Sequence, residues 1–258
     1  MSNIINLVSE SVFAEKMDIQ NKFLAAIAAN TGSPAVNSWS DVQALVRAGL
    51  ADRVFSVGDV LVCKRNGELL SWDIIGIDCD TPTDKGLSHS ITLMLHKVFS
   101  SRRFDEDADN CWKNSELRTW LNDTQNGFIT GLDPDFTAVL GAVDKINAVP
   151  DANGSGTVTA ETSSELIFIP SKTELFGTPT FGIAEGTKYP YFTGNEDREK
   201  YRNNAEKISF YYTRSVANVY GGTALSSDRI VLVNGTAGTE YAAAVPGAYG
   251  VVPTCCVV

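Results

Sequence analysis

Long apolar runs and positive charge are both scarce in this sequence. Its 258 residues hold 21 Lys and Arg against 31 Asp and Glu, for a net charge of −10. A membrane-spanning helix needs about 20 consecutive apolar residues, and nucleic acids and anionic membranes attract positively charged surfaces. We therefore expect no membrane insertion and no nucleic-acid partner. The first residues, Met1 to Ile4, also lack the basic and apolar regions of a secretory signal.

Histidine and cysteine, the residues behind many metal sites and nucleophiles, are few. His89 and His96 lie seven residues apart on one predicted strand and so face opposite sides of it, which disfavours a shared metal or acid–base pair. The five cysteines contain no Cys-x-x-Cys spacing, so neither a zinc site nor a disulfide framework is indicated. Adjacent Cys255 and Cys256 are predicted as buried small residues of a terminal strand. Because nucleophile-elbow, phosphate-loop and dinucleotide motifs are missing too, we expect no metal, no cofactor and no enzymatic activity.

Two acidic segments resemble cation-binding loops without completing them. Residues 151–156 place oxygen side chains at alternate positions, as a calcium loop does, but Thr162 stands where the bidentate glutamate should fall. We interpret residues 150–164 as a turn-rich loop. A second acidic turn, which either holds a cation or is simply solvated, contains Asp78, Asp80 and Asp84.

Residues 1–30 are predicted to form an oligomerisation helix. A heptad-like seam of apolar residues with one glutamine runs through residues 9–29; it consists of Phe13, Met17, Gln20, Leu24 and Ile27. A helix this short must bury its apolar face to be stable. Two interpretations stay open: packing on its own domain, or a parallel bundle that makes the chain a homo-oligomer, for which we favour a trimer.

Residues 31–51 are predicted to be a linker followed by a second helix. Ser38 and Asp41 form a helix-start signal, and Gly49 is a stop signal. We expect this helix to be separate from the domain that follows.

From residue 52 the apolar period becomes that of strands. Asn66-Gly67 marks a hairpin turn, and strands, a helical middle and further strands predict an α+β fold over residues 52–258. Residues 195–204 are densely charged and are predicted to be exposed.

Three segments of this domain carry recognisable motifs. Residues 112–122 are predicted as a short helix that buries apolar residues; its motif residues are Trp112, Asn114, Arg118, Trp120 and Asn122. Residues 208–215 are predicted as an aromatic and β-branched strand that ends in Arg214-Ser215. A terminal strand contains Gly250-Val251-Val252-Pro253.

In this order the three motifs resemble an uncharacterised domain family of gut bacteria and their phages. The family motifs are Asn-Ser-x-Leu-Arg-x-Trp-Leu-Asn, aromatic-aromatic-x-Arg-Ser and Gly-Val-x-Pro, and the resemblance covers about residues 55 to 258. Val252 stands where the family often has arginine, so no role of that arginine carries over. The family is similar to C-type-lectin-like folds, which include variable ligand-binding proteins of phages and formylglycine-generating enzymes.

The resemblance implies a non-enzymatic, virion-associated protein of a phage or prophage, made in the bacterial cytoplasm. It would display a C-type-lectin-like binding domain as a capsid decoration, fibre or tail adhesin. Its partners would be copies of itself, other virion proteins and a host-surface glycan or protein. Two alternatives are an enzyme related to formylglycine-generating proteins, which would need two cysteines in a substrate cleft, and a bacterial carbohydrate-binding module.

Arginine and tyrosine residues supply the candidate binding site. Arg118 and Arg214 stand in apolar segments, where a guanidinium must be paired; they either tie loops to the core or contact a ligand. A mixture of Tyr, Ser and Asn is typical of adaptable binding surfaces. The candidate ligand-binding residues are Tyr211, Tyr212, Arg214, Asn218, Tyr220, Ser226 and Tyr249.

Overall fold

The computed structural model describes residues 36–151, 157–201, 210–218 and 224–258. The predicted oligomerisation seam (Phe13, Met17, Gln20, Leu24 and Ile27), Tyr220 and most of the calcium-like loop lie outside the described residues.

The first sheet has five antiparallel strands in the order β1-β2-β4-β13-β8. They are β1 (Val60–Arg65), β2 (Glu68–Ile77), β4 (Ile91–Leu95), β13 (Thr254–Val257) and β8 (Ile167–Phe168). The hairpin predicted at Asn66-Gly67 is confirmed, because β1 pairs with β2 and both turn residues have positive φ, 50° and 84°. Cys255 and Cys256 are buried in β13, as expected.

The second sheet also has five strands, in the order β11-β10-β9-β12-β5. They are β11 (Thr239–Ala244), β10 (Leu225–Asn234), β9 (Phe210–Asn218), β12 (Ala248–Val251) and β5 (Ser100–Arg103). Only the pairing of β12 with β9 is parallel in this sheet.

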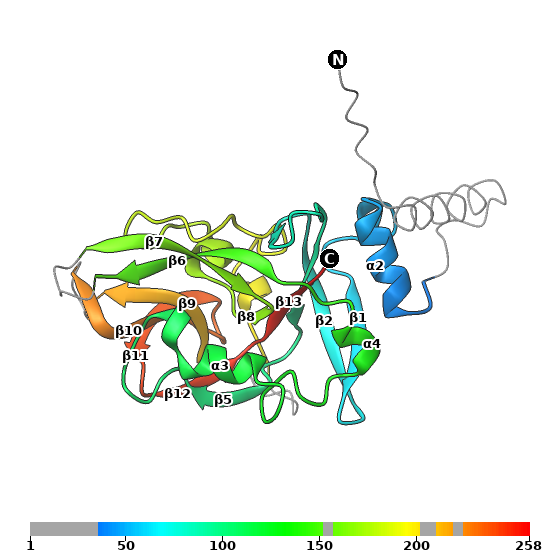
Figure 1. Ribbon diagram of the computed structural model, residues 1–258. Coiled ribbons are helices and arrows are strands. Elements are labelled where there is room, and N and C mark those ends of the chain that lie inside the picture. The colour runs from blue at the N-terminus through cyan, green and yellow to red at the C-terminus, as the bar shows by residue number, and fades with distance from the viewer. Residues whose placement is uncertain (1–35, 152–156, 202–209, 219–223) are drawn as a thin grey trace, which may run out of the picture.

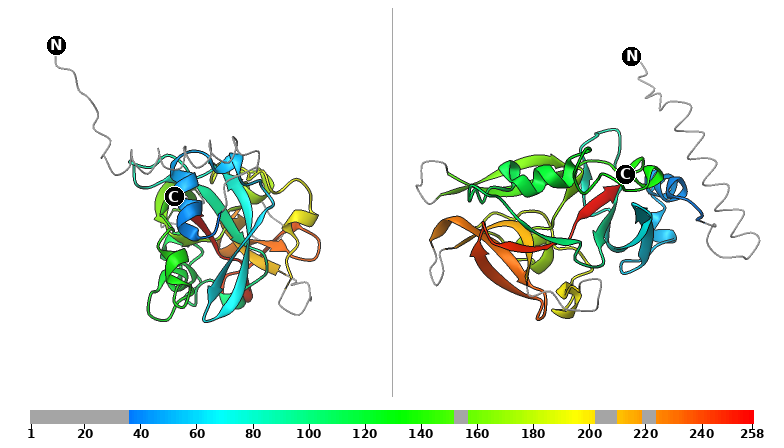
Figure 2. Two further views of the ribbon diagram at one scale, coloured as in Figure 1. Left: turned by 90° about the vertical axis from the view of Figure 1, so that its right-hand side faces the viewer. Right: turned by 90° about the horizontal axis from the view of Figure 1, so that it is seen from below.

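The third sheet has the order β3-β6-β7. Its strands are β3 (Thr81–Pro82), β6 (Val143–Pro150) and β7 (Val158–Glu165). The expectation of a loop over residues 150–164 was therefore wrong from Val158 onward, since β7 pairs with β6 along its whole length; residues 152–156 lie outside the described residues. Ala160, Thr162 and Ser164, at alternate positions of β7, are exposed and form its face toward water. Seen from below, the β6–β7 hairpin and the sheet around β9 lie side by side as two layers (Figure 2).

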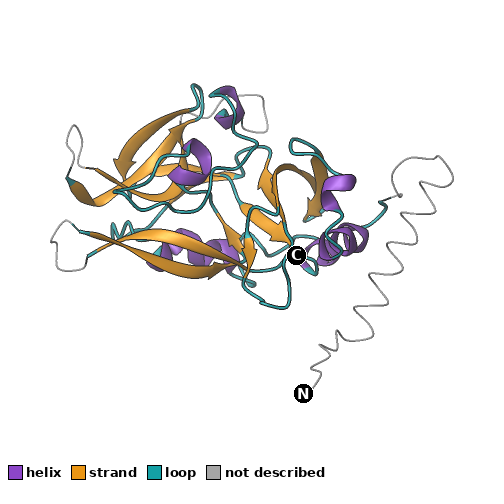
Figure 3. Cartoon of the chain, turned by 90° about the horizontal axis from the view of Figure 1, so that it is seen from above, coloured by secondary structure: helices purple, strands orange, loops and turns teal. Residues whose placement is uncertain are grey.

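The helices are short and lie around the strands (Figure 3). They are α2 (Trp39–Arg47), α3 (Glu116–Asn122), α4 (Pro134–Thr137) and α5 (Lys172–Phe176), with 3-10 turns at Ala51–Arg53, Trp112–Asn114 and Glu196–Arg198. Among the described residues, no helix is long and apolar enough to span a membrane. The chain is thus mostly antiparallel β-sheet with a few short helices, which fits the predicted fold class.

Helix α2 belongs to the main core rather than to a separate segment. Ser38 and Asp41 form the predicted capping box at its start. Its Trp39 ring lies 4.5 Å from that of Phe136 in α4, and Gln43 Nε2 donates to the carbonyl of Val258 at 2.9 Å. In Figure 1, α2 accordingly lies against the end of β13. The hydrophobic core therefore continues across the predicted domain boundary at residue 52.

The motif of residues 112–122 is structural. Asn122 Nδ2 donates to the carbonyl of Ile167 at 2.9 Å, and its Oδ1 accepts from the amide of Ile167 at 3.0 Å. The side chain therefore hydrogen-bonds to β8 as a neighbouring strand would. Trp112 is buried, and Asn114 Nδ2 donates to Asp109 at 3.0 Å on the surface.

Asn122→Ala is expected to lower the free energy of unfolding by about 1–3 kcal/mol, because it leaves a buried amide and a buried carbonyl of Ile167 without partners. Asn114→Ala is the matched control from the same motif, with an exposed hydrogen bond and an expected effect within about 0.5 kcal/mol. Urea denaturation of both variants measures the difference. Equal losses in the two variants would contradict the strand-like role of Asn122.

Candidate functional site

A pocket of about 350 Å³ opens between the β1–β2 hairpin and the segment that follows β4. Small-molecule sites begin at about this volume. One half of its lining is polar, including Arg65, Glu68, His96 and Lys97, and the other half is apolar, including Phe99. A pocket with both kinds of surface can fix the orientation of a ligand and also bury part of it.

The imidazole of His96 is held in this pocket by a buried carboxylate. Its Nδ1 lies 2.6 Å from Oδ1 of Asp73, a buried residue of β2, while the imidazole itself is 49% exposed. Lys200 Nζ donates to Asp73 Oδ2 at 3.2 Å and to the carbonyl of His96 at 3.3 Å. Since Asp73 occupies Nδ1, the ring nitrogen that a ligand in the pocket can reach is Nε2.

Burial shifts the pKa values of Lys200 and Tyr191, two residues beside Asp73. Burial lowers the pKa of Lys200, and Asp73 offsets this only in part. Burial and the neighbouring Asp73 carboxylate raise the pKa of Tyr191 to about 12, so its hydroxyl stays protonated at neutral pH. The buried Asp73 carboxylate, whose oxygens both have partners, holds the His96 imidazole in one orientation. The imidazole is therefore positioned to contact a ligand before the ligand binds.

The apolar side of the pocket continues into a cluster of rings. Arg65 lies 5.0 Å from the Phe99 ring and donates through Nε to the carbonyl of Phe128 at 2.9 Å. Phe99 lies 6.2 Å from Trp120, the motif residue, over which Arg102 stacks at 4.2 Å. Both arginines are thus fixed against aromatic faces beside the pocket.

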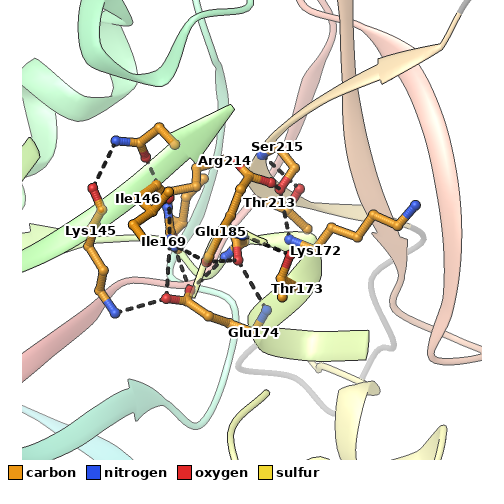
Figure 4. Close-up of polar contacts among 12 residues, drawn as sticks. Lys145, Ile146, Ile169, Lys172, Thr173, Glu174, Glu185, Thr213, Arg214 and Ser215 are labelled. Carbon is orange, nitrogen blue, oxygen red and sulfur yellow. Dashed lines mark hydrogen bonds and ion pairs between the residues drawn. The ribbon is translucent and has the colours of Figure 1, made fainter. Parts of the chain in front are cut away.

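Arg214, a predicted ligand-binding residue, lies instead at the centre of a buried network (Figure 4). Its guanidinium donates to both oxygens of Glu174, at 2.5 and 2.9 Å, and to the carbonyls of Ile169 and Glu185 at 3.0 and 3.1 Å. Although burial opposes its charge, Glu174 raises the pKa of Arg214 further. The structure therefore supports the reading in which Arg214 joins segments of the core.

The other predicted ligand residues that the structure describes are not brought together at one surface. Tyr211 and Tyr212 are fully buried, and their hydroxyls donate to the carbonyls of Arg198 and Gly247 at 2.8 and 2.5 Å. Ser226 is also buried, whereas Asn218 is exposed and Tyr249 is partly buried against Tyr212. Tyr211 and Tyr212 do not form a binding surface. They pack within the sheet, where aromatic residues are also favoured.

Arg118 tethers the motif helix to β7. Its Nε lies 2.9 Å from both carboxylate oxygens of Glu165, which is buried, while its own side chain is 29% exposed. Like Arg214, it ties two segments together.

His89 and His96 were predicted to lie on one strand, but they flank β4 on either side, and each has an aspartate partner that the sequence analysis missed. His89 Nδ1 lies 3.0 Å from Asp78 at the surface. The signal for the other pair was available: Asp73 is a charged residue inside the apolar run Trp72 to Ile75, where burial demands a partner. Residues 195–204 were also misjudged in part, because Arg198 and Lys200 are buried.

All five cysteines are free, and four of them are buried. Burial raises the pKa of Cys255 and of Cys256 well above the ordinary value. Within the described residues, no three His, Cys, Asp or Glu side chains are grouped as a metal site would need.

The chain is therefore a mostly antiparallel β protein with a charged interior and a preorganised pocket at His96. Residues 89–258 match the family model described as "Domain of unknown function (DUF6273)", and the chain belongs to that family. No curated protein and no solved structure matches the chain.

Proposed function

We propose that this protein is a ligand-binding domain whose pocket at His96 takes a carboxylated sugar of a glycan. The observation that carries the proposal is the half-exposed imidazole fixed by buried Asp73 and Lys200 at the pocket floor. Asp73 and Lys200 lie behind His96 and hold it in place before the ligand binds.

The charge of the pocket favours an acidic ligand. The whole chain carries a net charge of −10, yet two cationic side chains, Arg65 and Lys97, line the pocket together with a single carboxylate, Glu68. Cationic side chains around a pocket create a positive potential there and attract anions, even when the whole protein is acidic. The apolar side of the pocket, which includes Leu69, Val98 and Phe99, gives the apolar face of a sugar ring a surface to pack against.

The wider setting follows from the resemblance of the three motifs. We propose a C-type-lectin-like binding domain displayed by a virion-associated protein of a phage or prophage, without enzymatic activity. A homo-oligomer would multiply weak binding to a host-surface glycan by avidity.

His96→Ala is expected to weaken binding of glucuronic acid or N-acetylneuraminic acid about two- to tenfold, because Nε2, with Nδ1 taken by Asp73, can accept a hydrogen bond from a sugar hydroxyl, worth about 0.5–1.5 kcal/mol. His89→Ala is the matched control, since His89 also pairs with an aspartate but lies outside the pocket. Binding is followed by NMR titration of the full-length protein with each acid and with neutral glucose.

Wild-type protein should bind an acidic sugar and not glucose, and His89→Ala should bind as wild type does. The proposal fails if neither acid binds at millimolar concentration, or if His96→Ala binds them as tightly as His89→Ala does.

A further inference from the structure

Asp80 and Lys145 form a buried pair outside the pocket. The antiparallel register of β3 and β6, with Thr81 opposite Asp144 and Pro82 opposite Val143, places Asp80 opposite Lys145. Their side chains are 7% and 2% exposed, and Lys145 Nζ contacts Asp80 Oδ1 directly. An amine and a carboxyl group are thus held together, away from water, by the pairing of two strands.

A second carboxylate touches the same amine. Lys145 Nζ donates to Glu174 Oε1 at 2.9 Å and to the hydroxyl of Tyr189 at 2.7 Å (Figure 4 shows the contact with Glu174). Glu174 is itself fixed by Arg214 and by the capping box with Ser171 at the start of α5. It is placed to accept a proton from Nζ without moving.

The far oxygen of Asp80 faces donors. Thr92 Oγ1 donates to Asp80 Oδ2 at 2.5 Å, and the hydroxyl of Tyr189 donates to it at 2.8 Å. The Phe168 ring lies 4.2 Å from Lys145 Nζ and closes the apolar side. Donors aimed at one oxygen of a carboxyl group stabilise the negative charge that develops there when a nucleophile attacks its carbon.

We propose that Lys145 and Asp80 condense into an intramolecular amide bond that cross-links β3 to β6, with Glu174 as the proton carrier. Nothing beyond the side chains already in contact is needed. The amine is held against the carboxyl group that it would attack, so the reaction is an intramolecular step rather than a bimolecular encounter, which accelerates such reactions strongly.

The step balances without a co-reactant. The Lys145 ammonium first gives one proton to Asp80 Oδ1, which yields a neutral amine and a neutral acid. Nζ attacks Cγ, and the negative charge on Oδ2 is held by Thr92 and Tyr189. Glu174 takes a second proton from Nζ and passes it to the Oδ1 hydroxyl, which leaves as water. The amide nitrogen keeps one hydrogen, and Glu174 is again a carboxylate.

The buried environment both raises the barrier to this reaction and favours its product. Burial lowers the pKa of Lys145, but Glu174 and Asp80 outweigh it and keep the group an ammonium at rest, so bond formation follows a proton transfer. Burying an ion pair costs desolvation energy that its attraction often fails to repay. Condensation removes both charges from the interior and is therefore favoured there.

Mass spectrometry of the denatured, full-length protein tests the proposal. The expected mass is that of the sequence less one water, and Asp80→Ala and Lys145→Ala should each show the full mass of their own sequence. After complete tryptic digestion, cleavage at Lys145 should be lost, and residues 66–85 should be joined to residues 119–172.

Lys200 provides an internal control in the same digest. It is equally buried beside Asp73, but its Nζ is turned toward the carbonyls of Leu95 and His96 at 3.1 and 3.3 Å, so cleavage after Lys200 should be normal. A wild-type mass equal to that of the sequence, or a lost water that maps elsewhere, overturns the proposal. These readouts do not depend on whether the variants fold.

Discussion

Arg214→Ala is expected to lower the free energy of unfolding by about 3–5 kcal/mol, the cost of removing one partner from a buried ion pair. The guanidinium is fully buried and donates to Glu174, to Asn147 and to backbone carbonyls of three segments. Its loss leaves the Glu174 carboxylate without its guanidinium partner and several carbonyls without donors. Urea denaturation followed by circular dichroism measures the change.

Arg103→Ala is the control for Arg214→Ala. Arg103 is 56% exposed and pairs with Glu106 at 2.8 Å on the surface, where ion pairs contribute about 0–1 kcal/mol. If Arg214→Ala is as stable as Arg103→Ala, the buried network does not hold these segments together.

Glu174→Gln is expected to destabilise the protein strongly at pH 7, by about 3–5 kcal/mol, and much less in acid. Burial opposes ionisation of Glu174, but the Arg214 guanidinium, joined by Lys145 while its amine is free, outweighs it and holds the pKa of Glu174 at about 2, below the ordinary 4.5. A carboxyl group with a depressed folded pKa stabilises above its unfolded pKa and loses that contribution as pH falls toward the folded value. The difference from wild type should therefore shrink between about pH 4.5 and pH 2.

Glu185→Gln is the matched comparison, and it is expected to stay within about 1 kcal/mol of wild type at pH 7. Burial raises the pKa of Glu185 above 4.5 despite Arg214, so its ionised form is a cost that grows as pH rises through the folded pKa. Glutamine keeps an oxygen for the amide of Ala148, and the hydroxyls of Thr180 and Ser215 can turn to accept from the new amide. Unfolding free energies of both variants over a pH series test the pair. Equal losses at pH 7 would mean that Arg214 does not distinguish the two carboxylates.

Local signals predicted the local parts of this fold. The turn at Asn66-Gly67 and the cap at Ser38 were predictable because their geometry is decided by a few neighbouring residues. Adjacent Cys255 and Cys256 were placed correctly because alternation along a strand is also local.

The charged interior was not predictable in the same way. Asp73, His96 and Lys200 come from three separate segments of the chain, and only the tertiary fold brings them together. Tyr211 and Tyr212 have the composition of a binding surface, but their burial depends on strands β10 and β12 packing beside β9. A charged residue in an apolar run, such as Asp73, was the one sequence sign of this interior.

Strand β13 has a consequence for how the chain folds during synthesis. It lies between β4 and β8 in the first sheet (Figure 1), although β4 ends at Leu95 and β13 begins at Thr254. A ribosome therefore releases β1, β2 and β4 long before the strand that covers the open edge of β4. Until then that edge can pair with other chains, and closure over so long a separation is slow. We therefore expect the edge of β4 to stay open to other chains until β13 has been synthesised.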